Sequence, residues 1–104
     1  MTTDVGRTPH LTNHEARRRL EHERNSRLAQ LTAIEESAPH ADADLQAAQT
    51  SAIERVLEEI DAAGQRLSDG SYGACTGCRS TIPLERLEIL PYARFCVGCQ
   101  QRAT

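Results

Sequence analysis

The stretch GSYGACTGCRSTIPLERLEILPYARFCVGCQ, residues 70–100, decides the fold because it contains two Cys-x-x-Cys pairs. Cys75 and Cys78 form the first pair and Cys96 and Cys99 the second, and the chain has no other cysteine. Two such pairs complete a closed tetrahedral site of four thiolates, which zinc prefers. The sequence therefore predicts one structural zinc ion. No coordination position is left for water or substrate, which argues against an enzyme.

Three other uses of the cysteines fit less well. Two disulfides would need an oxidising compartment, and residues 1–7 show no apolar secretory signal. A redox pair is typical of alternating strands and helices, and it would leave the second pair unexplained. An iron–sulfur cluster usually takes three closely spaced cysteines, whereas these form two separated pairs. Zinc is therefore the favoured interpretation.

The composition indicates one small domain with little material for a core. The chain has 104 residues, of which 38% are hydrophobic and 3% aromatic, so metal binding is expected to supply part of the folding free energy. The formal net charge is −3, which disfavours nucleic acid as a ligand, and no apolar run is long enough to cross a bilayer. We expect a cytoplasmic monomer with no membrane association and no direct sequence-specific DNA binding.

A first helix is expected from Thr12, because Thr12 and Glu15 fit a capping box. The residues spaced for a helix seam are Ala16, Leu20, Arg24, Arg27, Leu31 and Ile34. The two arginines make the middle of this seam polar. Pro39 is expected to end the helix and to open a turn near residues 38–44.

A second helix has a clearer apolar stripe and is expected to stop near Leu67, with Gly70 free to adopt a left-handed cap. Its stripe comprises Leu45, Ala48, Ala52, Ile53, Val56, Leu57, Ile60, Ala63 and Leu67. The predicted fold class is mainly α, an antiparallel helical hairpin (coiled coil) followed by a small four-cysteine zinc finger. The predicted divisions are a flexible tail at 1–11, the hairpin at 12–67 and the zinc-finger module at 68–104.

The cysteine region carries further sequence features around its two pairs. Tyr72-Gly73 precedes the first pair, and Arg86-Leu87-Glu88 stands before Pro91 and the second pair. Over roughly residues 66–101 this pattern resembles the zinc finger of the DksA/TraR family, and the hairpin matches in architecture. The resemblance implies a transcription regulator that binds bacterial RNA polymerase directly. Its zinc finger would dock at the rim of the secondary channel, and its acidic hairpin tip would insert toward the active centre.

The resemblance points to three residues at the hairpin tip. In the best-known family members two Asp stand three residues apart and an Ala follows two residues after the second. Here Asp42 and Asp44 are two apart, and Ala47 follows three after Asp44. Counting back from the first cysteine, Asp44 falls where short, TraR-like members carry their second tip Asp, so the resemblance makes Asp44 the first candidate and Asp42 the second. Alternatively, the two Asp only cap the helix and solvate the turn.

The arginines admit functional and structural interpretations. Arg86 stands in the matched motif and is a candidate docking residue of the zinc finger. Arg79, Arg86 and Arg94 lie close in sequence to the cysteines and would offset the negative charge of the thiolates. The basic run 17–19, together with Arg24 and Arg27, either contacts a partner or pairs with acidic residues of the hairpin.

Two other functions stay open. One is a zinc-stabilised helical interaction module with a different protein partner, which the altered tip spacing favours. The other is a zinc ribbon that binds nucleic acid.

Overall fold

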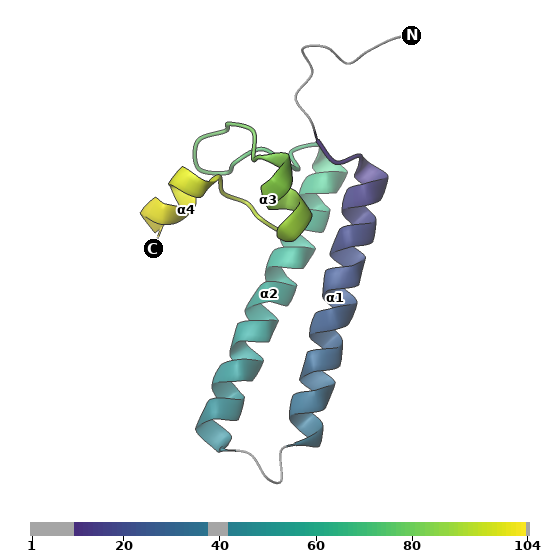
Figure 1. Cartoon of the computed structure of the whole chain (residues 1–104), viewed down its shortest axis with the longest axis vertical. Helices are drawn as coiled ribbons and strands as arrows, with labels where there is room; N and C mark the ends of the chain where they lie inside the picture. The colour runs from purple at the N-terminus through teal and green to yellow at the C-terminus, as the bar shows by residue number, and fades with distance from the viewer. Residues whose placement is uncertain (1–9, 38–41, 104) are drawn as a thin grey trace.

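The computed structural model describes residues 10–37 and 42–103, and in them the predicted mainly helical fold is confirmed (Figure 1). Helices α1 (Asn13–Glu36) and α2 (Ala43–Asp69) run antiparallel and form the hairpin. The short helices α3 (Leu84–Ile89) and α4 (Val97–Ala103), which the sequence analysis did not predict, lie in the cysteine region at the end of the hairpin away from its turn. Pro39 and residues 1–9 of the predicted tail lie outside the described residues.

The start of α1 is fixed by the predicted capping box. The amide of Glu15 donates to Thr12 Oγ1 at 3.1 Å, and the amide of Thr12 donates to Glu15 Oε1 at 3.0 Å. The hydrogen bond that the Thr12 amide donates to the Glu15 carboxylate is the main cause that lowers the pKa of Glu15. Leu11, the residue before the cap, is only 7% exposed and joins the same core cluster as Ala16, four positions into the helix. Leu11 therefore belongs to the core, although the sequence analysis placed it in the tail.

The two helix ends next to the turn are capped by side chains as well as by backbone. The amide of Ser37 donates to the carbonyls of Ala33 and Ile34, each at 3.2 Å. The Ile34 carbonyl also accepts a hydrogen bond from Gln46 Nε2 of α2 at 2.8 Å. Asp42 is the N-cap of α2, because its Oδ1 accepts from the amide of Leu45 at 2.9 Å.

The link between α2 and the cysteine region is tightly folded. Gly70 takes the predicted left-handed conformation, with φ of 86°, and α2 ends at Asp69, two residues beyond the expected stop at Leu67. The amides of Ser71 and Tyr72 then donate to the Arg66 carbonyl at 2.9 and 3.1 Å. The chain therefore reverses direction directly after α2, and these hydrogen bonds fix how the zinc finger is attached to the hairpin.

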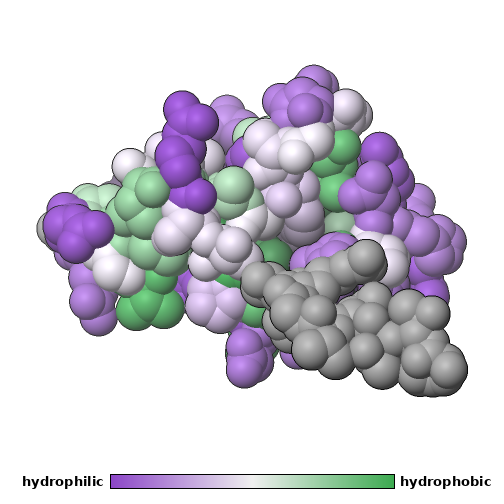
Figure 2. Space-filling model, turned by 90° about the horizontal axis from the view of Figure 1, so that it is seen from above, coloured by the Kyte–Doolittle hydropathy of each residue, from purple (hydrophilic) through white to green (hydrophobic). Residues whose placement is uncertain are grey.

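One hydrophobic core joins the base of the hairpin to the zinc finger. Its buried members are Leu11, Ala16, Leu20, Ile60, Ala63, Leu67, Cys75, Ile82, Leu87, Ala93 and Cys99. Toward the turn the apolar stripe is less covered, and Leu45 is 59% exposed. Seen from the finger end, the surface is a mosaic in which apolar spots are separated by polar groups (Figure 2). Across the described residues, no helix combines the length and apolar character that crossing a bilayer requires.

Candidate metal centre

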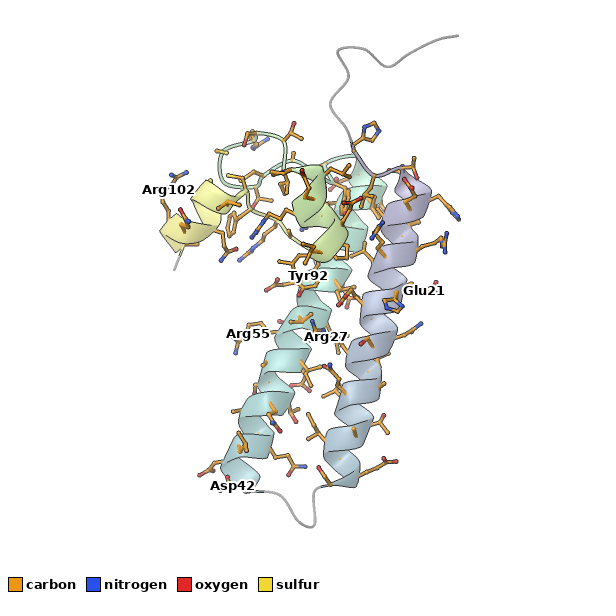
Figure 3. All side chains as sticks on the ribbon, in the orientation of Figure 1. Glu21, Arg27, Asp42, Arg55, Tyr92 and Arg102 are labelled. Carbon is orange, nitrogen blue, oxygen red and sulfur yellow. The ribbon has the colours of Figure 1, made fainter. Side chains whose placement is uncertain are left out.

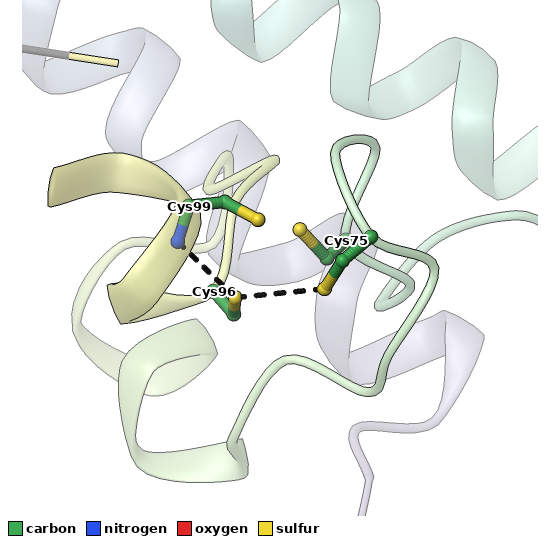
Figure 4. Close-up of side chains that lie close together, drawn as sticks. Cys75, Cys96 and Cys99 are labelled. Atoms are coloured by element: carbon green, nitrogen blue, oxygen red, sulfur yellow. Dashed lines mark hydrogen bonds between the residues drawn. The ribbon is translucent and has the colours of Figure 1, made fainter. Parts of the chain in front are cut away.

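The four cysteines gather at one point of the zinc finger (Figure 4). Their sulfur atoms all lie within 4.8 Å of one another, and the sulfurs of Cys78 and Cys96 are 3.8 Å apart. A tetrahedron with zinc–sulfur bonds of about 2.3 Å has edges of about 3.8 Å. Four sulfur donors at this spacing therefore fit a single tetrahedral ion, and they leave no position for a substrate.

The first pair is held by a loop that turns back on itself. The amide of Cys75 donates to the Ser80 carbonyl at 2.8 Å, and the amide of Gly77 donates to Cys75 Sγ at 3.3 Å. Arg79 adopts a left-handed conformation with φ of 69°, which closes the loop directly after Cys78. The Ser80 hydroxyl lies 2.9 Å from Cys78 Sγ. Backbone and hydroxyl groups thus surround the first pair with partners for thiolate sulfur.

The second pair stands at the start of α4. The amide of Cys99 donates to Cys96 Sγ at 3.4 Å, so the cysteine sulfur serves the first turn much as an N-cap oxygen would. Arg102, one turn further along α4, donates from Nη2 to Cys99 Sγ at 3.2 Å. This contact raises the pKa of Arg102 and brings a positive charge to the site.

Backbone contacts join the two pairs into one unit. The amide of Thr76 donates to the Arg94 carbonyl at 2.8 Å. Arg86 Nε, on α3, donates to the Phe95 carbonyl at 3.0 Å, next to the second pair. Arg94 itself lies over the Phe95 ring, 4.8 Å from its centroid. Arg86 and Arg94 therefore support the fold around the site, and among the described arginines it is Arg102 that donates to a cysteine sulfur.

The thiols of Cys75, Cys78 and Cys99 differ in pKa because their sulfurs accept different hydrogen bonds and also hydrogen-bond to one another. Burial raises the pKa of Cys75, but amides that donate to its sulfur outweigh this and lower the pKa to about 6. The Ser80 hydrogen bond lowers the pKa of Cys78, whereas the hydrogen bond with Cys75 raises the pKa of Cys99 to about 11. Four negative sulfurs this close need a cation between them, so metal binding displaces the remaining protons.

The residues predicted at the tip lie at the opposite end of the hairpin (Figure 3). Asp42 is occupied as the N-cap of α2. Asp44 and Ala47, in the first turns of α2, are exposed, and among the described residues no hydrogen bond or ion pair engages the Asp44 carboxylate. The structure thus separates two kinds of site, a metal centre at one end and an acidic turn at the other.

The basic run 17–19 finds few partners inside the molecule. Arg19 Nη1 donates to the Glu88 carbonyl at 3.3 Å, which ties α1 to α3. Arg17 and Arg18 make no hydrogen bond or ion pair with any residue of the described chain. Further along α1, Arg24 Nη1 contacts Asp61 Oδ1 of α2 at 2.6 Å. The expectation of intramolecular pairing with the second helix is therefore met at Arg24.

Sequence comparisons identify the finger. Residues 70–104 match the family model of the prokaryotic dksA/traR C4-type zinc finger. General stress protein 16O of Bacillus subtilis is 49% identical over 45 residues, 43% of this chain and 28% of that protein. The RNA polymerase-binding transcription factor DksA of Caulobacter vibrioides is 42% identical over 48 residues, 46% of this chain and 34% of that protein. The chain thus spans about a third or less of the length of these curated relatives.

Solved structures extend the likeness to the hairpin. Transcription factor DksA2 from Pseudomonas aeruginosa superposes with a TM-score of 0.74 over 98% of this chain and 90% of its own, at 24% identity. The RNA polymerase binding protein and transcriptional regulator Dks from Chlamydia trachomatis gives a TM-score of 0.50 over 88% and 89%, at 26% identity. The likeness to DksA2 establishes the fold of this chain. The chain therefore joins a DksA-like helical hairpin to a DksA/TraR C4-type zinc finger, and its predicted zinc cofactor is confirmed.

Proposed function

We propose that this chain, with its zinc finger of the DksA/TraR family, is a transcription regulator that binds bacterial RNA polymerase in the cytoplasm. The observation that carries the proposal is the whole-chain likeness to transcription factor DksA2, together with the family match of the finger. The chain acts by binding and not by catalysis, because the metal centre found among the described residues is closed by four cysteines.

The zinc finger docks at the rim of the secondary channel in this proposal. Arg86 is a candidate docking residue, because its terminal nitrogens make no hydrogen bond within the described chain while its Nε is fixed by the Phe95 carbonyl. The guanidinium is therefore held in one orientation before a partner is met, which lowers the entropy lost on binding. A carboxylate of the partner is the group that such a fork fits best.

The acidic tip inserts toward the active centre. A helix of 27 residues such as α2 is about 40 Å long, so the hairpin carries Asp44 far from the docked finger. The Asp44 carboxylate is exposed and makes no hydrogen bond or ion pair with any described residue, whereas Asp42 already caps α2, which makes Asp44 the first candidate for contact. Ala47 lies one turn beyond Asp44, and its small side chain permits close approach of a partner. Regulation follows when the tip favours one conformational state of the polymerase over another.

The test combines binding to core RNA polymerase with the lifetime of promoter complexes. The double variant Asp42→Asn with Asp44→Asn keeps a side chain that can cap α2, so the fold is retained while the negative charge is lost. We expect it to bind polymerase as the parent chain does but to lose the effect on promoter complexes. Glu54→Gln with Glu58→Gln, exposed residues in the middle of α2, is the matched control and should keep that effect.

Two results would contradict the proposal. One is failure of the zinc-loaded parent chain to bind core polymerase. The other is an equal loss of effect in the tip variant and the mid-helix control.

A further inference from the structure

We infer that the hairpin is divided at Arg27 into a stable base half, residues 13–26 and 57–69, and a distal half, residues 28–37 and 42–56, which opens locally while the base half and the zinc finger stay folded. The inference concerns the free protein and stands without the proposed function. It rests on how apolar burial, polar contacts and packing change along the two helices.

Burial falls sharply from the base half to the distal half. The base half contributes five buried apolar residues, which are Ala16, Leu20, Ile60, Ala63 and Leu67. Ile53, at 9% exposure, is the one buried residue of the distal half among those described. Leu28 is 41% exposed and Leu45 59% exposed. Because a hairpin is stabilised mainly by its buried stripe, the distal half has much less to hold it closed.

Arg27 stands at the boundary and interrupts the seam. Figure 3 shows it between the two helices. Its Nε is buried and has no hydrogen-bond partner, an arrangement that costs stability. The terminal nitrogens turn to residues of the same helix, Glu23 Oε2 at 3.6 Å and Gln30 Oε1 at 3.4 Å. Arg27 thus takes a seam position without joining α1 to α2.

The distal half is loosely packed inside. An apolar hollow of about 440 Å³ opens between its helices, and it is lined by Gln30, Ala33, Ile34, Gln49, Ala52 and Ile53. In the view of Figure 1 the two ribbons draw apart toward the turn. Thr32 Oγ1 also donates back to the Leu28 carbonyl at 3.2 Å, a bond that weakens and bends helices. The side-chain bond that spans the distal half is the one from Gln46 to the Ile34 carbonyl.

Opening of this segment has a direct consequence for the tip. Segments with few buried apolar contacts and exposed backbone hydrogen bonds open with low free energy, often as one cooperative unit. The base half shares its core with the zinc finger and is therefore protected from the same opening. Asp42 and Asp44 are carried by the part of the molecule that opens most readily.

Amide hydrogen exchange of the full-length, zinc-loaded chain tests the division. We expect amides of residues 28–37 and 42–53 to exchange at least tenfold faster than those of residues 16–24 and 60–67. Arg27→Leu fills the seam with an apolar side chain and removes the unpaired Nε, so it should slow exchange in the distal half at least tenfold and leave the base half unchanged. Glu23→Gln with Arg27→Met, which removes both charges, should act in the same direction if the first variant folds poorly.

Arg17→Leu is the matched control, because Arg17 is exposed and makes no hydrogen bond or ion pair with a described residue. It should leave the difference between the halves as it is. Equal exchange in the two halves of the parent chain would overturn the inference. So would slowing of both halves alike by the Arg27 variants, or a change by Arg17→Leu as large as theirs.

Discussion

Gly77 shows how closely the metal centre fits its loop. A Cβ placed on Gly77 would lie 3.0 Å from Cys99 Sγ and 3.3 Å from Cys99 Cβ. These distances are tighter than almost all Cβ contacts in proteins, so a side chain at position 77 has to displace Cys99, a cysteine of the opposite pair. The need for glycine at this position is therefore one of space, since the cysteine pairs approach each other across it.

We predict that Gly77→Ala weakens zinc binding by roughly tenfold or more, because the added methyl group shifts Cys99 from its position. Competition with a chelator of known affinity measures the change. Gly64→Ala is the matched control, since a Cβ there meets nothing within 4 Å and Gly64 lies inside α2. It should bind zinc normally and gain up to about 1 kcal/mol of stability. Unchanged zinc affinity in Gly77→Ala would refute the close fit.

Tyr72 gives the finger a distinct response to high pH. Its hydroxyl donates to the Pro91 carbonyl at 2.8 Å, and burial raises the pKa of the phenol to about 12. A raised folded-state pKa means that stability is fully present below the ordinary value of 10.0 and is lost as pH rises toward 12.

Urea denaturation at several pH values between 9 and 12 should therefore show a falling free energy of unfolding. Tyr72→Phe should be less stable at pH 9, since the hydrogen bond is lost, but its stability should decline less as pH rises. Tyr92→Phe retains Tyr72 and is expected to keep the parent's decline. An identical pH dependence for the parent chain and Tyr72→Phe would contradict this account of the phenol.

At the scale of the elements, the capping box of α1 matters because Leu11 and the finger core lie beside it. Thr12→Ala removes the oxygen that accepts from Glu15 and should cost about 1 kcal/mol in thermal or urea unfolding. Thr32→Ala, in the exposed interior of the same helix, removes only the bond back to the Leu28 carbonyl. Because alanine is the better helix former, that variant should be neutral or slightly more stable. Equal destabilisation by both variants would show that the capping box makes no specific contribution to the free energy of unfolding.

The long elements were predictable because their signals are local. The Thr12 box, the α2 stripe and the left-handed Gly70 each depend on a few neighbouring residues. The short helices α3 and α4 escaped prediction because segments of 6 and 7 residues are not stable alone and form only against the core and the cysteines. Leu11 carried a usable local signal, because an apolar residue just before an N-cap often packs against the fourth residue of the helix.

The metal site, too, has a part that the sequence predicts and a part that it does not. Its four cysteines follow from spacing, whereas the partners of their sulfurs depend on the path of the chain. Arg102 lies three residues after Cys99, a separation at which side chains meet only if the segment is helical, so it could be found only once α4 was known. Arg86 was predicted for docking and also has a structural contact, the Phe95 carbonyl, which no sequence pattern indicates.

Across the entire chain, two structurally different ends are joined by the helices α1 and α2. The core ties the finger to the hairpin base, and the Arg66 guanidinium adds contacts to the carbonyls of Tyr92 and Ala93 at 3.4 and 3.5 Å. These contacts hold the zinc finger rigidly against the base of the hairpin. The other end presents the exposed Asp44 on sparsely packed helices. Such an arrangement suits a protein that docks at one end and probes at the other.

The most direct test of this arrangement is a site-specific crosslink from residue 44 to RNA polymerase. A photoreactive cysteine reagent would label all the cysteines, so a photoreactive amino acid is introduced at position 44 in one variant and at Glu21 in another. Glu21 is exposed on the half of α1 that is nearer the zinc finger (Figure 3). We predict crosslinks from position 44 to polymerase residues around the active centre and from position 21 to the mouth of the secondary channel. Crosslinks from position 44 to the outer surface of the polymerase, away from that channel, would contradict it.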